Sequence, residues 1–79
     1  MARYSLEIMW NRTQVLDATC SAAMAWENIR LMAQQFVNAE KAGYEMPTLV
    51  DLANAESGAV FTGEAKDDTG HASFVAVAL

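Results

Sequence analysis

Hydrophobic and polar residues alternate over the opening positions 3–10 of the chain. The residues on the apolar side of this segment are Tyr4, Leu6, Ile8 and Trp10. A period of two that is rich in aromatic and branched side chains is typical of a half-buried β-strand. We therefore expect a strand over 3–10, a tight turn at Asn11–Arg12, and a short strand over 13–17 that returns as a hairpin.

Residues 19–42 carry the pattern of the one long helix. Apolar side chains recur there in steps of three or four, at Ala22, Trp26, Ile29, Ala33 and Phe36. This spacing places them on one stripe of a helix, which then packs on one face of a sheet. Thr19 and Ser21 are candidate N-caps, and Gly43 is a typical helix stop. The aromatic residues on this stripe and on the first strand are expected in the core.

The segment that follows Pro47 has two interpretations. Residues 48–54 fit a third strand, or a short helix capped by Thr48, since Thr48 and Asp51 form a weak capping box. Both alternatives remain open from the sequence.

The C-terminal third predicts two more strands. Residues 59–66 and 71–79 read as strands, and 67–70 (Asp-Asp-Thr-Gly) is a hairpin signal with turn chemistry. The last strand is apolar on both sides, which suits a central place in the sheet or an intermolecular contact. The expected fold is a single α+β domain over 1–79, in the order β-β-α-β-β-β. It has an antiparallel sheet of four to five strands, with one long helix packed on one face.

Composition limits the classes of function. A chain of 79 residues with 53% hydrophobic residues forms one small domain with a modest core. Ten acidic residues outnumber five basic ones, for a net charge of −5. Phosphate contacts need Lys and Arg, so we expect no direct nucleic-acid binding. We also expect no membrane span and no signal peptide, because Glu7 interrupts the opening segment.

Candidate chemistry is sparse. A single cysteine, Cys20, allows no internal disulfide, which favours the cytoplasm. Cys20 lies at the expected helix start and His71 follows a turn, so a thiol or hydrolytic pair is one hypothesis. Adjacent Asp67 and Asp68 fit a solvated turn better than a calcium loop. We expect no enzyme activity, no metal site and no cofactor.

Charge is distributed unevenly along the chain. Residues 1–44 contain four bases and four acids, whereas residues 45–79 contain six acids and one lysine. The whole net charge therefore belongs to the C-terminal part. One interpretation is solubility. The other is a negative patch that steers the protein toward a basic partner. The candidate partner-binding residues are Glu45, Asp51, Glu56, Glu64, Asp67 and Asp68.

Three stretches carry a resemblance to short bacterial proteins of ββαββ build. These are Ala2-Arg3-Tyr4-Ser5-Leu6-Glu7-Ile8, Ser21-Ala22-Ala23-Met24-Ala25-Trp26, and the turn Asp67-Asp68-Thr69-Gly70. In size, acidity and build the chain also resembles anti-CRISPR proteins, which are short products of phages or mobile elements. That resemblance implies a non-enzymatic inhibitor in the host cytoplasm that blocks the basic nucleic-acid groove of a CRISPR effector complex or a similar protein.

The alternative function is a small bacterial interaction module that forms a homodimer. Such a dimer would pair through an edge strand or through 74–79. Salt separates the two hypotheses, because a complex steered by charge weakens as salt rises and an apolar dimer does not.

Overall fold

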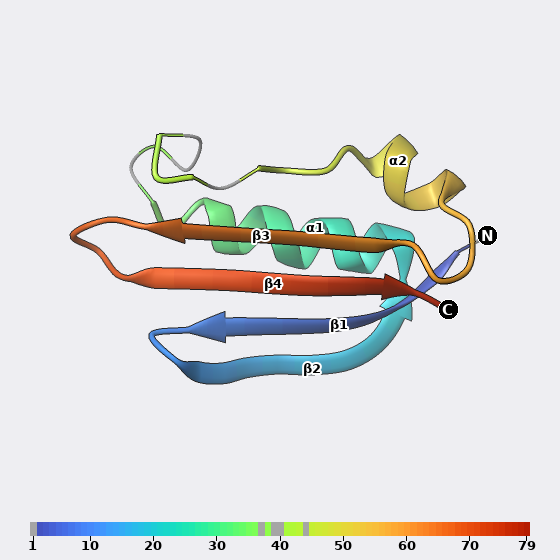
Figure 1. The fold of residues 1–79 in the computed structure, drawn as a ribbon, viewed down its shortest axis with the longest axis horizontal. Coiled ribbons are helices and arrows are strands. Elements are labelled where there is room, and N and C mark those ends of the chain that lie inside the picture. Colours follow the sequence, from blue (N-terminus) through green and yellow to red (C-terminus); the bar gives the residue numbers. More distant parts are fainter. Residues whose placement is uncertain (1, 37, 39–40, 44) are drawn as a thin grey trace.

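The described residues of the chain fold into one four-stranded sheet and two helices. The computed structural model describes residues 2–36, 38, 41–43 and 45–79 (Figure 1). The elements, in chain order, are β1 (Arg3–Trp10), β2 (Thr13–Ser21), α1 (Ala22–Ala33), α2 (Leu49–Asn54), β3 (Val60–Lys66) and β4 (His71–Ala78).

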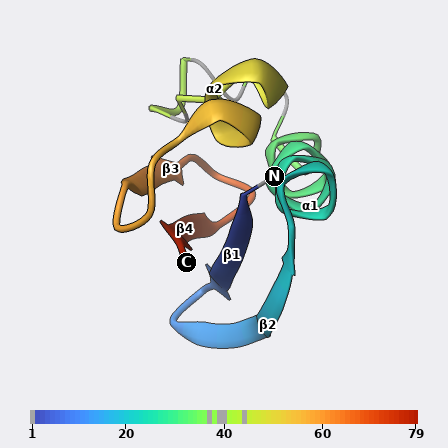
Figure 2. The same cartoon turned by 90° about the vertical axis from the view of Figure 1, so that its right-hand side faces the viewer.

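The sheet is antiparallel throughout, with the strand order β2-β1-β4-β3. The α+β class is therefore confirmed, and β4 has the central place that its apolar sequence favoured. Figure 2 shows both helices on one face of the sheet, and no element of the described residues lies over the other face. We refer to that second face as the open face.

The core lies between the sheet and α1. Alternate residues of β1 and β4 point toward the helix, and alanines on β4 let it approach closely. The buried hydrophobic residues are Tyr4, Leu6, Ile8, Ala22, Ala25, Ile29, Phe36, Leu52, Ala65, Ala72, Phe74, Ala76 and Ala78. Phe36 packs against Trp10 with ring centroids 5.7 Å apart, so the aromatic residues join the core side of the sheet.

The β1–β2 hairpin turns through two residues in the left-handed region. Asn11 has φ 49° and Arg12 has φ 67°, the pattern of a two-residue turn whose twist matches that of the strands. The second strand continues to Ser21, so the expected strand over 13–17 was too short. The register shifts by one residue opposite Ile8 and Met9, which marks a β-bulge in β2.

The long helix is shorter than its apolar pattern predicted. Residues 19–21, expected in the helix, belong to β2, where Thr19 pairs with Ser5. Ser21 caps α1, because its Oγ accepts a hydrogen bond of 3.2 Å from the Met24 N–H. At the other end the helix stops after Ala33, and turns follow that place Phe36 in the core. Of the rest of the predicted helix, positions 37, 39 and 40 lie outside the described residues.

The segment after Pro47 is the short helix α2, so the strand alternative is wrong and the sheet has four strands. The Thr48 Oγ1 accepts a hydrogen bond of 3.0 Å from the Asp51 N–H at its start. Leu52 is fully buried, and the Tyr4 hydroxyl donates to the Leu52 carbonyl over 2.6 Å. These two contacts fix α2 against the start of β1.

The C-terminal hairpin agrees with the sequence prediction. β3 and β4 pair from Val60↔Val77 to Lys66↔His71. In the turn between them, the Asp67 Oδ1 accepts a hydrogen bond of 2.7 Å from the Thr69 N–H. Asp67 therefore serves the turn, as expected from its type and position.

Candidate functional site

The six acidic residues singled out from the sequence lie in segments that border β3. One precedes α2, one lies within it, one is in the turn that leads to β3, one is on β3, and two are in the β3–β4 turn. In that order they are Glu45, Asp51, Glu56, Glu64, Asp67 and Asp68. Five are exposed and Asp67 is half-buried. They form a rim along one side of the molecule rather than a single cluster, and we call it the β3 rim.

The middle of the β3 rim is a groove with a carboxylate-bearing wall. Glu45 and Asp51 line this groove, which has a volume of about 340 Å³. Its remaining lining residues come from the chain before α2, from β3 and from β4: Met46, Pro47, Val60, Phe61, Thr62 and Phe74. Lys and Arg lay their apolar stems along hydrophobic surface while the charged head meets a carboxylate. This combination of lining residues suits a basic side chain.

The far end of the β3 rim is less negative than its sequence suggests. Asp67 and Asp68 share a hollow of about 530 Å³ with Lys41 and Lys66. The two lysines offset the two aspartates there.

Glu64 is engaged with a neighbour on the open face. Its Oε1 lies 2.8 Å from the Nε2 of His71, one strand away. Of the six acids, it alone has an ion-pair partner within the described part of the chain. Glu45 and Asp51 are therefore the pair that the structure brings together and leaves available.

The outer edge of β3 is covered at one end. The Lys66 N–H donates to the Ala42 carbonyl over 3.1 Å. Gly43 follows with φ +107°, and a Cβ there would lie 3.1 Å from the Glu64 carbonyl oxygen. This close approach favours glycine at position 43 and keeps residues 42–43 against the strand. Figure 1 shows the described parts of the connection from α1 to β3 running along this side of the sheet.

The structure separates the cysteine and the histidine of the enzyme hypothesis. Cys20 lies in β2, not at a helix start, and pairs with Tyr4, which pairs with Ala78. His71 is seven residues earlier on β4, roughly 23 Å away along the strand. Burial raises the pKa of the Cys20 thiol, and the charge of Arg3 opposes this only in part. A Cys20–His71 pair is therefore not formed.

Within the described residues, no three His, Cys, Asp or Glu side chains are grouped so that they could hold a metal ion. None of the helices seen in residues 2–36 and 45–79 has the length and hydropathy to cross a bilayer.

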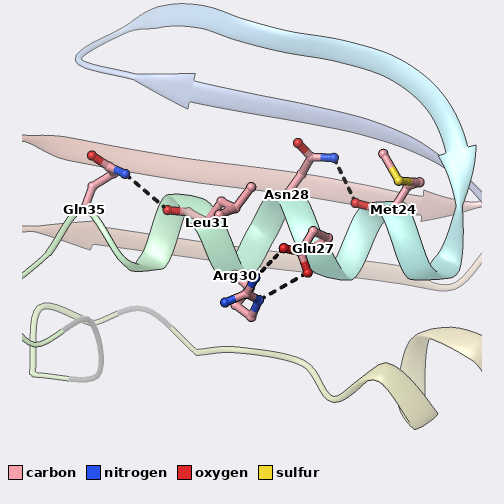
Figure 3. Close-up of polar contacts among 6 residues, drawn as sticks. All are labelled: Met24, Glu27, Asn28, Arg30, Leu31 and Gln35. Carbon is pink, nitrogen blue, oxygen red and sulfur yellow. Dashed lines mark hydrogen bonds and ion pairs between the residues drawn. The ribbon is translucent and has the colours of Figure 1, made fainter.

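A second surface lies at the opposite edge of the sheet, and the sequence analysis missed it. Val15 is 51% exposed and Leu31 is 46% exposed, and both line a groove of about 260 Å³ between β2 and α1. Figure 3 shows the side of α1 that borders this groove, where the Asn28 amide donates to the Met24 carbonyl over 2.8 Å. The Gln35 amide likewise reaches the carbonyl of Leu31.

Two acids that the sequence analysis counted as balanced lie beside this second surface. Glu7 pairs directly with Asp17 across β1 and β2, so both carboxylates project from the open face. The helix acid Glu27 is instead paired with Arg30, on the other side of α1 (Figure 3). A count by halves of the chain cannot distinguish these two situations, because only the strand register reveals the pairing.

Comparison with protein-family models, with curated proteins and with solved structures finds no match for this chain.

Proposed function

We propose that this chain is a non-enzymatic protein-binding inhibitor that uses the β3 rim to occupy the basic groove of a nucleic-acid-binding protein, in the manner of anti-CRISPR proteins. The molecule that this chain would recognise is the positively charged surface of its partner. No catalytic residue is needed for this function, since occupying a groove excludes the nucleic acid that would otherwise bind there.

The observation that carries the proposal is the groove lined by both Glu45 and Asp51. Two carboxylates beside the apolar side chains of Pro47 and Phe61 provide a receptor for a Lys or Arg side chain. Neither carboxylate has an ion-pair partner among the described residues. Their charge is therefore available to an incoming cation and steers it over longer distances.

Glu56 extends the negative potential beyond the start of β3, whereas at the other end of the strand Lys41 and Lys66 offset the charges of Asp67 and Asp68. Glu56 is exposed and acts through charge at long range rather than through a fitted contact. Exposed ion pairs contribute about 0.2–1 kcal/mol each. The whole rim therefore raises the association rate, and the central groove sets the position of the partner.

The first test is binding of a basic peptide of alternating Arg and Ser, measured by calorimetry at low and high salt. We expect the double variant Glu45→Gln/Asp51→Asn to bind about 3- to 10-fold more weakly, which corresponds to two exposed ion pairs. The control variant Glu56→Gln/Asp68→Asn removes the same charge from exposed positions that do not line the groove. Equal weakening by both variants would show only a dependence on net charge and would contradict the groove.

The second test addresses the partner. The wild-type chain and the Glu45→Gln/Asp51→Asn variant serve as baits in host lysate, and the retained proteins are identified by mass spectrometry. We expect a basic nucleic-acid-binding protein on the wild-type bait that is released by salt and reduced on the variant. Purified chain should then displace nucleic acid from that protein. A captured protein that keeps its nucleic acid in the presence of excess chain would contradict inhibition.

A further inference from the structure

The outer edge of β2 is bare. The strand stands at one end of the sheet order, and it continues into α1 at Ser21 without a connecting loop. The Leu79 N–H donates to the Arg3 carbonyl, so the backbone N–H and C=O groups of the odd-numbered residues of β1 point toward β4. Those of the even-numbered residues point toward β2. The register then directs the backbone groups of Asp17 and Thr19 outward. Among the described residues, nothing hydrogen-bonds to them.

An apolar groove runs along this bare edge on the helix side. Val15, Leu16, Leu31 and Met32 line it, together with the aliphatic parts of neighbouring polar residues. The bulge at Val15 places two consecutive side chains on this side of the strand. The amides of Asn28 and Gln35 bond to carbonyls of α1 itself, so they do not need a partner in the groove.

A negative pair flanks the same edge on the open face. Glu7 and Asp17 stand directly opposite one another, a placement that destabilises a sheet when both are charged. Gln14 donates to the Glu7 carboxylate over 2.8 Å, which is the one hydrogen bond that the Glu7 side chain makes within the described residues. Asp17 has no ion pair or side-chain hydrogen bond there.

These charges distinguish between two occupants of the edge. Asp17 is the middle residue of β2, so symmetric pairing with a second copy along the whole strand would place Asp17 opposite its own counterpart. Each Glu7 would lie one strand further in, and four carboxylates would gather on one face. A strand from another protein with a Lys or Arg opposite Asp17 would instead neutralise the repulsion between the Asp17 and Glu7 carboxylates.

We propose that the β2 edge docks an extended segment of another protein as a fifth strand. The segment alternates apolar and basic residues. Its apolar side chains enter the groove between β2 and α1, and a Lys or Arg on the open face meets Asp17 and Glu7. Main-chain hydrogen bonds to Asp17 and Thr19 supply affinity, and the two faces supply specificity. This surface shares no residue with the β3 rim, so docking at the β2 edge can be tested separately from the proposed function.

The probe is a capped peptide of alternating Val and Lys, about six residues long, the usual length of a strand. The peptide is titrated into ¹⁵N-labelled protein. We expect shift changes over residues 13–21 and along α1, and slowed hydrogen exchange at the amides of Asp17 and Thr19. A peptide with Glu in place of Lys, and one N-methylated on its pairing edge, should each bind at least tenfold more weakly.

Matched variants separate docking from general attraction between opposite charges. Asp17→Lys should weaken binding about tenfold, whereas Glu56→Lys, an equal charge change on the β3 rim, should leave binding within about twofold. Leu31→Gln should weaken it about threefold, and Val50→Gln, on the exposed side of α2, should not. Circular dichroism checks that each variant is folded. We expect all four to fold, because the substituted side chains are exposed.

Several results would overturn the proposal. Shift changes confined to residues 45–68 would place the peptide on the β3 rim. Equal effects of Asp17→Lys and Glu56→Lys would show only general attraction between opposite charges. A wild-type protein that sediments as a dimer with protected Asp17 and Thr19 amides would show that a second copy occupies the edge.

Discussion

The two edge strands of the sheet differ in how the chain connects them to α1. After β2 the chain enters α1 at once, because Ser21 is both the last strand residue and the helix cap. After α1 it takes residues 34–59 to reach β3 on the opposite edge (Figure 1). That connection carries α2 and covers part of the β3 edge, whereas nothing in the described chain covers β2.

Each edge of the sheet avoids unwanted strand pairing by its own means. The β3 edge is shielded at one end, where the Ala42 carbonyl accepts a hydrogen bond from the Lys66 N–H and Gly43 lies close to the Glu64 carbonyl. The β2 edge relies on a bulge at Val15 and on the charge of Asp17, two devices that discourage edge-to-edge association. A shielded edge presents side chains to a partner, and a bare edge also presents backbone groups.

The largest expected effect comes from removing the anchor of the connection. Leu52→Ala should lower the free energy of unfolding by about 2–4 kcal/mol, because the side chain is fully buried and a cavity remains. Leu49→Ala, on a side chain that is 40% exposed in the same helix, is the control and should cost less than about 1 kcal/mol. Urea unfolding measures both. Similar losses would mean that α2 is not fixed by Leu52.

The hydrogen bond of Tyr4 is the second anchor. Tyr4→Phe should cost about 1–2 kcal/mol, because the Leu52 carbonyl loses a buried donor. Burial raises the pKa of the Tyr4 hydroxyl, so the folded state keeps its proton at a pH where the unfolded chain releases it. The stability that this group contributes is present below pH about 10 and declines above it.

Urea unfolding of both proteins from pH about 8 to about 11 tests the sign of this dependence across the ordinary Tyr pKa. The difference between wild type and Tyr4→Phe should shrink as the pH rises. A difference that grows with pH would contradict the buried, protonated hydroxyl.

The hairpin that carries the bare edge offers a gain in stability. Arg12→Gly should raise the free energy of unfolding by about 0.5–1 kcal/mol, because Arg12 has φ 67° and glycine adopts that region without strain. Asn11→Gly is the comparison variant, since it removes the bond that the Asn11 side chain accepts from the His71 N–H over 2.9 Å. An equal gain from both would show that this side-chain bond contributes nothing.

The smallest effect on stability comes from the charge on the bare edge. Asp17→Asn should change the free energy of unfolding by no more than about 0.5 kcal/mol, through relief of the repulsion with Glu7. It should also promote self-association in sedimentation experiments at high protein concentration, because the edge loses its protecting charge. Glu56→Gln, at an exposed turn, is the control. A monomer at all concentrations would show that the bulge alone protects the edge.

The elements with strong alternation were predictable from the sequence. The periods of two in β1 and β4 identified both strands, and the turn at 67–70 followed from its residue types. The length of α1 did not follow, because its apolar stripe continues to Phe36, which reaches the core from a turn. A periodic pattern records which residues are buried, and a helix is only one way to bury them.

The register of the first hairpin explains why the second surface was missed. A two-residue turn at Asn11–Arg12, continued without interruption, pairs Glu7 with Leu16 and places both on one face. Apolar Leu16, Ala18 and Cys20 need the other face, and a one-residue bulge moves them there. The register set by the two-residue turn conflicts with the apolar pattern of β2. This conflict was the signal in the sequence for the bulge, and therefore for the pairing of Glu7 with Asp17.

The candidate site was predictable in part. The acids of residues 45–68 were found by charge counting, and they do border one strand. Charge counting could not predict that Glu45 and Asp51 share a groove, or that Lys41 and Lys66 lie beside Asp67 and Asp68. Those placements depend on how residues 34–59 cross the molecule.

Both proposed surfaces depend on one structural claim, that the connection covers the Lys66 end of the β3 edge and leaves the β2 edge bare. Native-state hydrogen exchange, read for each amide by NMR, tests it most directly. The account predicts slow exchange at the Lys66 amide, which is bonded to Ala42, and fast exchange at the outward-facing amides of Asp17 and Thr19. Fast exchange at Lys66 together with slow exchange at Asp17 and Thr19 would contradict it.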